Sequence, residues 1–186
     1  NTKIKKINNF FNEDKILKII KNQKIDCILH SHLFEHIYNP KKFLNFLYKI
    51  SNINCKHIIS VPDMFRMVKN NQTNVVFFEH PFYYDLDKIK QIFSECGFKF
   101  NKNLFFGKGH SIMIEFTKIK KKIKVINKNK YKTNLKLFKN LFNKLSNDAK
   151  KIDMISKKNK IFFFGAHISS QILFFLIKYK LYINGI

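Results

Sequence analysis

The first two-thirds of the chain alternates between short apolar runs and segments whose apolar residues recur at helical spacing. Isoleucines and a leucine at this spacing predict a helix within Asn12–Asn22. Lys24–His30 is a near-continuous apolar run, which is typical of a strand buried on both faces, as in a parallel sheet. A second helix is expected to begin at Asn39, which can cap it, and Pro40, which fits the first helical position.

The middle of the chain continues this alternation. His57–Val61 is predicted to be the next buried strand, and Met64–Thr73 is expected to be a polar loop. Asp85 can cap a further helix, and Gly97 is placed to end it. These signals extend the repeated pattern of strand followed by helix.

Two closely spaced strands complete this part of the chain. Lys99–Phe106 and His110–Thr117 are separated only by Gly107, Lys108 and Gly109, so they predict an antiparallel hairpin. With a short possible strand at Lys3–Ile7 before the first helix, the pattern is three strand–helix units followed by a hairpin, which indicates an α/β fold. We expect a mostly parallel sheet with helices on both faces and an antiparallel last strand.

The pattern changes after the hairpin. Lys118–Lys132 is a lysine-rich connector, and Thr133–Ser156 has the spacing of one long amphipathic helix. A strand at Lys160–Phe164, a glycine-containing turn and a helix at Ile168–Lys180 then predict the start of a second α/β unit. We therefore expect three parts. Residues 1–118 form the first α/β part, residues 119–158 the lysine-rich connector and the long helix, and residues 159–186 the start of the second α/β unit.

The charge of the chain is strongly basic. It has 36 Lys and Arg against 12 Asp and Glu, a net charge of +24, which is the usual footprint of nucleic-acid binding. Arg66, however, is the only arginine, and nucleic-acid readers favour the arginine fork. Lys, Asn, Ile and Phe share A/T-rich codons, so we attribute most of the charge to genome composition. A nucleic-acid partner is therefore not favoured.

Composition also limits the class of protein. Hydrophobic residues make up 45% of the chain, which is enough for a packed core. No apolar run reaches the roughly 18 residues of a membrane span, and the N-terminal residues do not form a signal peptide. Cys27, Cys55 and Cys96 are odd in number and far apart, which favours a reducing cytoplasm over a disulfide scaffold.

The loop after the first buried strand holds a group of polar residues. His30 and Ser31 lie where that strand is predicted to end, and ligands of open α/β sheets bind at the carboxyl ends of strands. The spacing of His30, His32 and His36 matches neither a strand face throughout nor a helical face. No thiolate or carboxylate cluster joins them, so we expect no metal site. For Glu35 and His36 we favour a structural role that ties the loop to the following helix.

A second candidate is the pair Glu79 and His80. Pro81 forces His80 into an extended conformation, and a carboxylate beside an imidazole can bias it for general-base catalysis. Adjacent side chains of an extended chain point to opposite sides, so a polar turn before a helix is an equally good interpretation. The turn at Gly165 lacks a full glycine-rich phosphate motif and is a weak signal by itself.

Taken together, these segments resemble the class I S-adenosylmethionine-dependent methyltransferases. Asp26–Pro40, with its Leu-Phe-Glu-His-Ile run, resembles the segment after their fourth strand, and Lys56–Asp63 resembles their fifth strand. More narrowly, the chain resembles the sugar C-methyltransferase branch, because Glu79-His80 precedes the helix ending at Gly97. The strand and Gly-Ala-His turn within Lys160–Leu173 resemble the opening of that branch's C-terminal Rossmann-like domain.

The resemblance implies S-adenosylmethionine as cofactor and residues 1–118 as a partial methyltransferase domain. His30 and Ser31 would line the methionine end of the cofactor, and Asn9 and Phe10 would lie near its adenine. The family's glycine-rich turn and ribose-binding acidic residue would lie upstream of Asn1. We therefore expect that the chain is cut at its N-terminus and lacks part of the cofactor site by itself.

The resemblance also implies the reaction. Glu79 and His80 would lie on the substrate side, with His80 as the base that abstracts a proton next to a keto group. The expected acceptor is a nucleotide-linked sugar methylated on carbon, in carbohydrate biosynthesis. Phe77 stands where that branch tends to have Tyr, and the three cysteines do not supply its zinc module. Two alternatives remain, namely another acceptor class with a structural His80, and a basic nucleic-acid-binding module without catalysis.

Overall fold

The computed structural model describes residues 11–21, 23–73, 79–106, 110–125, 129–162, 168–178 and 183–184. The chain forms two compact units that interleave along the sequence. Unit 1 comprises Asn1–Val61, Leu86–Phe106 and Ser111–Asn127. Unit 2 comprises Pro62–Asp85, Gly107–His110 and Lys128–Ile186. The three-part division at residues 118 and 158 stays a prediction.

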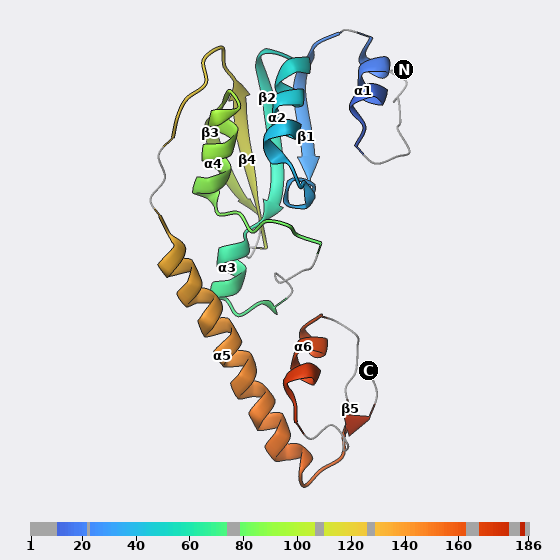
Figure 1. Ribbon diagram of the computed structural model, residues 1–186, viewed down its shortest axis with the longest axis vertical. Helices are drawn as coiled ribbons and strands as arrows, with labels where there is room; N and C mark the ends of the chain where they lie inside the picture. The colour runs from blue at the N-terminus through green and yellow to red at the C-terminus, as the bar shows by residue number, and fades with distance from the viewer. Residues whose placement is uncertain are drawn as a thin grey trace. The chain divides into compact units, whose positions relative to one another are not determined.

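Unit 1 is built on a four-stranded sheet with the order β1-β2-β4-β3 (Figure 1). Strands β1 (Ile25–Ser31) and β2 (Ser51–Pro62) pair in parallel. Strands β3 (Phe98–Phe106) and β4 (Ser111–Lys118) pair antiparallel. The sheet is therefore mixed and open, which confirms the predicted α/β fold with an antiparallel last strand. That last strand lies between β2 and β3 rather than at the edge of the sheet.

Local sequence signals set the helices of unit 1. Helix α1 (Glu13–Ile20) begins where the Asn12 side chain accepts from Lys15 N at 2.9 Å. Helix α2 (Pro40–Ile50) has Asn39 in the same capping role. Helix α4 (Leu86–Glu95) is followed by Gly97, whose φ of +90° suits glycine. The cap at Asn39 and the stop at Gly97 were predicted, whereas α1 was predicted from the helical spacing of its apolar residues and not from its cap.

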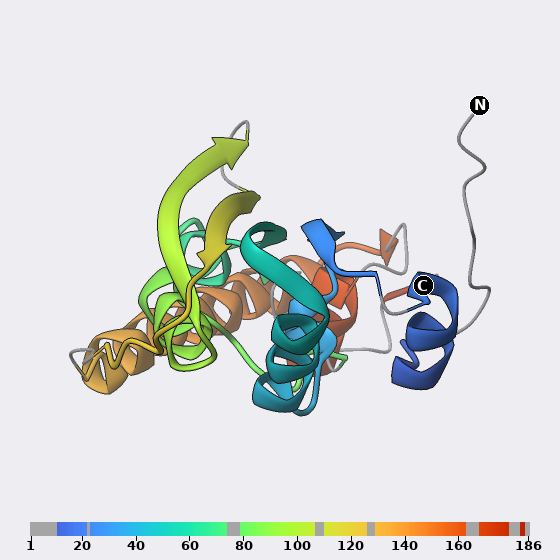
Figure 2. The ribbon, with the colours of Figure 1, turned by 90° about the horizontal axis from the view of Figure 1, so that it is seen from above.

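The helices α2 and α4 lie on the same face of the sheet, as Figures 1 and 2 both show. The prediction of helices on both faces is therefore wrong for the described part of unit 1. Both helices belong to crossover connections that move the chain in the same direction across the sheet. Crossover connections between parallel strands are right-handed. Two crossovers in the same direction therefore place their helices on the same face of the sheet.

Strand β1 also differs from its prediction. Its apolar run suggested burial on both faces, but Leu29 is 68% exposed and Cys27 is exposed as well. The physical reason is that β1 lies at the edge of the described sheet, with α2 and α4 covering only one of its faces. Apolar periodicity reports the composition of a strand and does not reveal which neighbours cover it.

The core of unit 1 is largely aromatic. Phe34, Phe93, Phe98 and Phe116 are fully buried, and the rings of Phe93 and Phe116 stack with centroids 4.0 Å apart. Burial of each such side chain contributes about 2–3 kcal/mol to the free energy of unfolding. This packing between α4 and the strands holds the ends of β1 and β2 in place for the site described below.

Unit 2 contains a helix that the sequence did not predict. Helix α3 (Met64–Lys69) occupies the segment expected to be a polar loop. The Asp63 carboxylate caps it by accepting from Arg66 N at 3.3 Å. Met64, Met67 and Val68 are buried in one cluster with Leu141 and Leu145 of helix α5 (Tyr131–Ser156). Burial against a helix far along the chain therefore stabilises α3 and overrides the polar appearance of the segment.

The C-terminal part of unit 2 is a strand–helix–strand element. Strand β5 (Ile161–Phe162) pairs in parallel with β6 (Ile183–Asn184), and helix α6 (Ile168–Leu176) lies between them in sequence. This arrangement confirms the predicted start of a second α/β unit. The Gly107–Gly109 and Gly165–His167 turns lie outside the described residues. Among the helices described, none is long and apolar enough to cross a membrane.

Candidate functional site

The carboxyl end of β1 places consecutive side chains in different surroundings. His30 packs into the aromatic core, with ring centroids 5.6 Å from Phe43 and 6.4 Å from Phe34. Ser31 is exposed. This alternation follows from the pleat of the strand, which directs neighbouring side chains to opposite faces. The proposed role of both residues in cofactor binding stays a prediction.

His30 has a partner that the linear sequence did not reveal. Its Nε2 lies 3.0 Å from Nε2 of His57 on β2, so one ring donates a hydrogen bond to the other. His57 is completely buried and contacts the rings of Phe93 and Phe98. Burial lowers the pKa of His30 to about 4, and it holds the pKa of His57 well below its usual value. Both imidazoles are therefore neutral at physiological pH.

A second polar group lies just beyond the end of β1. His32 Nδ1 is 3.3 Å from Oε1 of Glu35, which belongs to the short 3-10 helix η1 (Phe34–His36). On its other side, His32 Nε2 is 3.3 Å from Oγ of Ser111, the first residue of β4. The three side chains form a line from a buried carboxyl to a surface hydroxyl. Such a carboxylate–imidazole pair can orient a ring and stabilise its protonated form.

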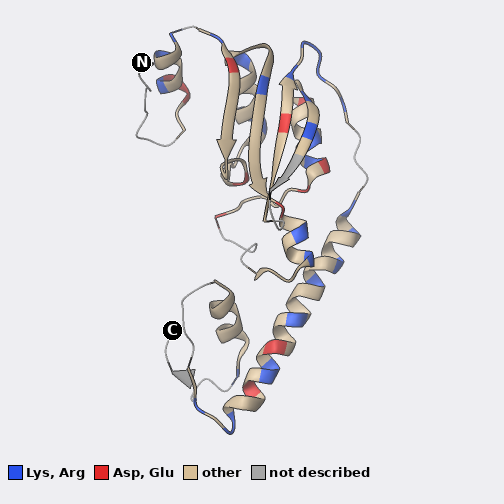
Figure 3. Cartoon of the chain, turned by 180° about the vertical axis from the view of Figure 1, so that it is seen from behind, with Lys and Arg blue, Asp and Glu red and all other residues tan. Residues whose placement is uncertain are grey.

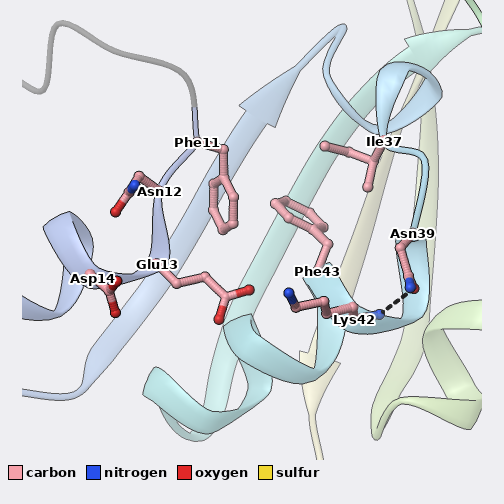
Figure 4. Close-up of a pocket in the computed structure, with 8 residues that line it drawn as sticks. All are labelled: Phe11, Asn12, Glu13, Asp14, Ile37, Asn39, Lys42 and Phe43. Atoms are coloured by element: carbon pink, nitrogen blue, oxygen red, sulfur yellow. Dashed lines mark hydrogen bonds between the residues drawn. The ribbon is translucent and has the colours of Figure 1, made fainter.

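The segment between β1 and α2 contributes Ile37 and Asn39 to a hollow beside α2, shown in Figure 4. The hollow has a volume of about 430 Å³, within the range of about 300–1,000 Å³ typical of ligand pockets. The rings of Phe11 and Phe43 meet there edge to face, with centroids 4.9 Å apart. Glu13 and Lys42 extend toward one another from α1 and α2. The lining residues are Phe11, Asn12, Glu13, Asp14, Ile37, Asn39, Lys42 and Phe43.

The residues of this hollow suit an adenosine group. Aromatic rings provide a surface for a flat base, and carboxylates can accept hydrogen bonds from ribose hydroxyls or an exocyclic amine. Phe11 and Asn12 directly follow Asn9 and Phe10, which the family resemblance places near the adenine. Asn9 and Phe10 themselves lie outside the described residues.

The predicted catalytic pair belongs to unit 2. Glu79 is exposed, and His80 is half-buried with its ring centroid 6.3 Å from that of Tyr83. Nearby, burial raises the pKa of Tyr84 to about 12. The catalytic role of Glu79 and His80 stays a prediction.

Sequence reasoning did not reveal the contacts that three residues make in the site in unit 1. His57 lies 27 residues from His30 and Ser111 lies 79 residues from His32, so neither contact has a local signature. Glu35 was interpreted as structural, although its position three residues after His32 is the spacing that lets the two side chains meet. That spacing is the one signal that could have indicated the pair.

The comparisons with known proteins point to one family. Residues 2–102 match the family described as a methyltransferase domain. A search of curated proteins found no matching relative.

Two solved structures are among those similar to this chain. One is an S-adenosylmethionine-dependent methyltransferase from Thermotoga maritima, a possible histamine N-methyltransferase, with 17% identity and a TM-score of 0.40 over 52% of this chain and 59% of that one. The other is magnesium protoporphyrin IX methyltransferase from Synechocystis PCC 6803 with bound S-adenosylhomocysteine, with 12% identity and a TM-score of 0.40. That match covers 52% of this chain and 46% of the other.

The chain thus spans about half of the length of the solved proteins it matches. The family match carries the assignment, because it covers more than half of the chain and includes β1, β2 and the loop with His32 and Glu35. The chain belongs to the methyltransferase-domain family, whose members use S-adenosylmethionine.

Proposed function

We propose that the protein transfers a methyl group from S-adenosylmethionine to a small polar acceptor. The observation that carries this proposal is the family match over residues 2–102, which includes the loop that leaves β1 and lines the hollow beside α2. Methyl transfer requires mainly that donor and acceptor are held in line. Few catalytic side chains are therefore needed, and the role of the fold is to position the two reactants.

Each part of the proposed cofactor site has a chemical reason. Phe11 and Phe43 would hold the adenine, and the carboxylates at the start of α1 would hold the ribose. Ser31, exposed at the end of β1, would lie toward the methionine end of the cofactor. When bound, the cofactor supplies an electrophilic methyl group on sulfur.

For the acceptor we propose a nucleotide-linked keto sugar that is methylated on carbon. This choice is supported by the resemblance of Glu79-His80 and of Lys160–Leu173 to the sugar C-methyltransferase branch. In that proposal the His80 side chain lies on the substrate side of the site. Another acceptor class, with His80 in a structural role, is the alternative within the same reaction.

The cofactor site is tested by titrating S-adenosylhomocysteine into the full-length protein in a calorimeter. Phe11→Ala should weaken binding about 2- to 10-fold, the effect of losing one aromatic contact. Ile53→Ala is the matched control, because Phe11 and Ile53 are 40% and 43% exposed and Ile53 does not line the hollow. No binding to the unmodified protein would refute the proposal, and equal affinity of the Phe11 variant would remove this hollow from it.

A second candidate function follows from the charge. The net charge is +24, and Figure 3 shows lysines along the length of α5. Such a helix could contact a nucleic-acid backbone without reading its sequence. This function predicts tight binding to random-sequence DNA that weakens steeply with salt, whereas methyl transfer to a small acceptor does not require it.

A further inference from the structure

The carboxyl group of Glu35 occupies an unusual position. Glu35 is only 2% exposed, and acidic side chains are almost never fully buried without a partner. Burial raises its pKa, while the nearby His32 and His36 oppose that shift. Its Oε1 lies 3.3 Å from His32 Nδ1. Glu35 is thus placed where it acts on the ring of His32.

The backbone of His32 is also unusual. Its φ of +48° lies in the left-handed region, which a residue other than glycine seldom adopts. The conformation is held by a hydrogen bond from His32 N–H to the carbonyl of Ser60 on β2, at 2.8 Å. Strained residues of this kind concentrate at functional sites, because the strain persists only where surrounding contacts enforce it. Here it turns the imidazole toward Glu35 and Ser111.

The other edge of the His32 ring is accessible. The side chain of His32 is 43% exposed, and its Nε2 lies 3.3 Å from Ser111 Oγ at the start of β4. If Nδ1 carries the proton toward Glu35, Nε2 keeps its lone pair for a hydrogen-bond donor. Serine can donate to that lone pair, and so can the polar group of a bound acceptor. This edge of the ring is therefore suited to receive a proton.

We propose that His32 is the proton acceptor in methyl transfer, with Glu35 as its positioning residue and Ser111 as a hydrogen-bonding group beside it. The inference rests on the proposed methyltransferase function and places the base in unit 1 instead of at His80. The acceptor's electron pair forms a bond to the methyl carbon as the carbon–sulfur bond breaks. The electrons of the broken carbon–sulfur bond stay on sulfur, and the proton of the acceptor passes to His32 Nε2. S-adenosylhomocysteine leaves, and the imidazolium later releases its proton to water.

The kinetic test uses radiolabelled S-adenosylmethionine with a dTDP-linked keto sugar as the probe. His32→Gln should lower kcat about 10²- to 10⁴-fold, the usual contribution of a general base. Binding of S-adenosylhomocysteine should remain within about twofold of the unmodified protein. His110→Gln, at an exposed histidine, is the matched control and should keep its activity.

The positioning role of Glu35 has its own readout. Glu35→Gln should reduce kcat about 10-fold, because the carboxylate no longer holds the His32 ring with Nε2 toward the acceptor. A purely structural role would lower stability and leave the tautomer preference of His32 in place. Glu115→Gln, which removes a carboxylate that accepts from Asn101 on the sheet, should leave kcat unchanged.

A measurement without any acceptor separates this inference from the proposed function. Nitrogen chemical shifts of His32 should show the Nδ1–H tautomer in the unmodified protein and a loss of that preference in Glu35→Ala. Equal tautomer populations in both proteins would overturn the positioning by Glu35. Near-normal kcat in His32→Gln would overturn the inference even if methyl transfer occurs, and loss of turnover in His80→Ala alone would return the role to His80. A protein that binds no S-adenosylhomocysteine would refute the proposed function. The tautomer result would still show whether Glu35 orients the ring of His32.

Discussion

The pair of the partly buried His30 and the buried His57 should make unit 1 sensitive to acid. The pKa of His30 is lowered by burial from 6.5 to about 4, and that of His57 is lowered as well. The unfolded chain therefore binds more protons than the folded chain between these pH values. Because of this difference, the free energy of unfolding rises with pH through this window, and the stability is lost as the pH falls from above 6.5 toward 4.

The size of the effect follows from the His30 values alone. A shift of this size corresponds to about 3 kcal/mol when it is fully expressed, at pH values below the folded pKa. At pH 5 the unfolded imidazole is almost fully protonated and the folded one is not, so about 2 kcal/mol should be lost relative to pH 8. His57 acts in the same direction. With a urea slope of about 2 kcal/mol/M, the unfolding midpoint should fall by about 1 M or more.

The assay is urea unfolding at pH 8 and pH 5, followed by the backbone amide signals of Ile28 and Ile59, which pair β1 with β2 near the two histidines. The matched variant replaces both His30 and His57 by Phe, since removing both partners of a buried hydrogen bond costs little. Its midpoint should change much less with pH than that of the unmodified protein. If both proteins lose the same stability on acidification, other groups carry the acid sensitivity and the reasoning is wrong.

Three further predictions concern packing and charge. Gly97→Ala should lower stability in thermal unfolding by about 1–3 kcal/mol, because its φ is +90° and an added Cβ would lie 2.5 Å from the Tyr48 ring; an unchanged melting temperature would contradict this. Lys118→Met should cost about 1–3 kcal/mol in urea unfolding, since the Lys118 ammonium donates to the carbonyls of Tyr48 and Ser51 at 2.6 Å, whereas the exposed Lys102→Met should change stability by less than about 0.5 kcal/mol. Binding to random-sequence DNA should be weak at physiological salt, and submicromolar affinity with a steep salt dependence would instead support the nucleic-acid function.

The sequence predicted those elements whose ends carry a local signal. Asn39 caps α2 and Gly97 ends α4 as expected, and Asn12 gives α1 a cap of the same kind. Each of these signals acts within one helical turn, so it is visible in a short stretch of sequence. The hairpin strands were predicted for the same reason, because their pairing depends on residues that are close in the chain.

Features that depend on distant contacts could not be predicted in this way. Helix α3 has a cap at Asp63, but its apolar residues are stabilised by burial against α5, which lies far along the chain. The exposure of Leu29 depends on which helices cover β1. The partner of His30 on β2 and the partner of His32 on β4 are brought together by the sheet order β1-β2-β4-β3, which the spacing of residues within the sequence does not encode.

The end of β1 shows how one short segment can serve both stability and chemistry. His30 points into the core, where its neutral pairing with His57 joins the two parallel strands. The strand ends at Ser31, and the left-handed turn at His32 breaks the alternation that would have returned the His32 side chain to the core. His32 is therefore held at the surface while its backbone stays attached to β2 through Ser60. A base must be both accessible and fixed in direction; His32 meets both conditions, whereas the buried ring of His30 meets only the second.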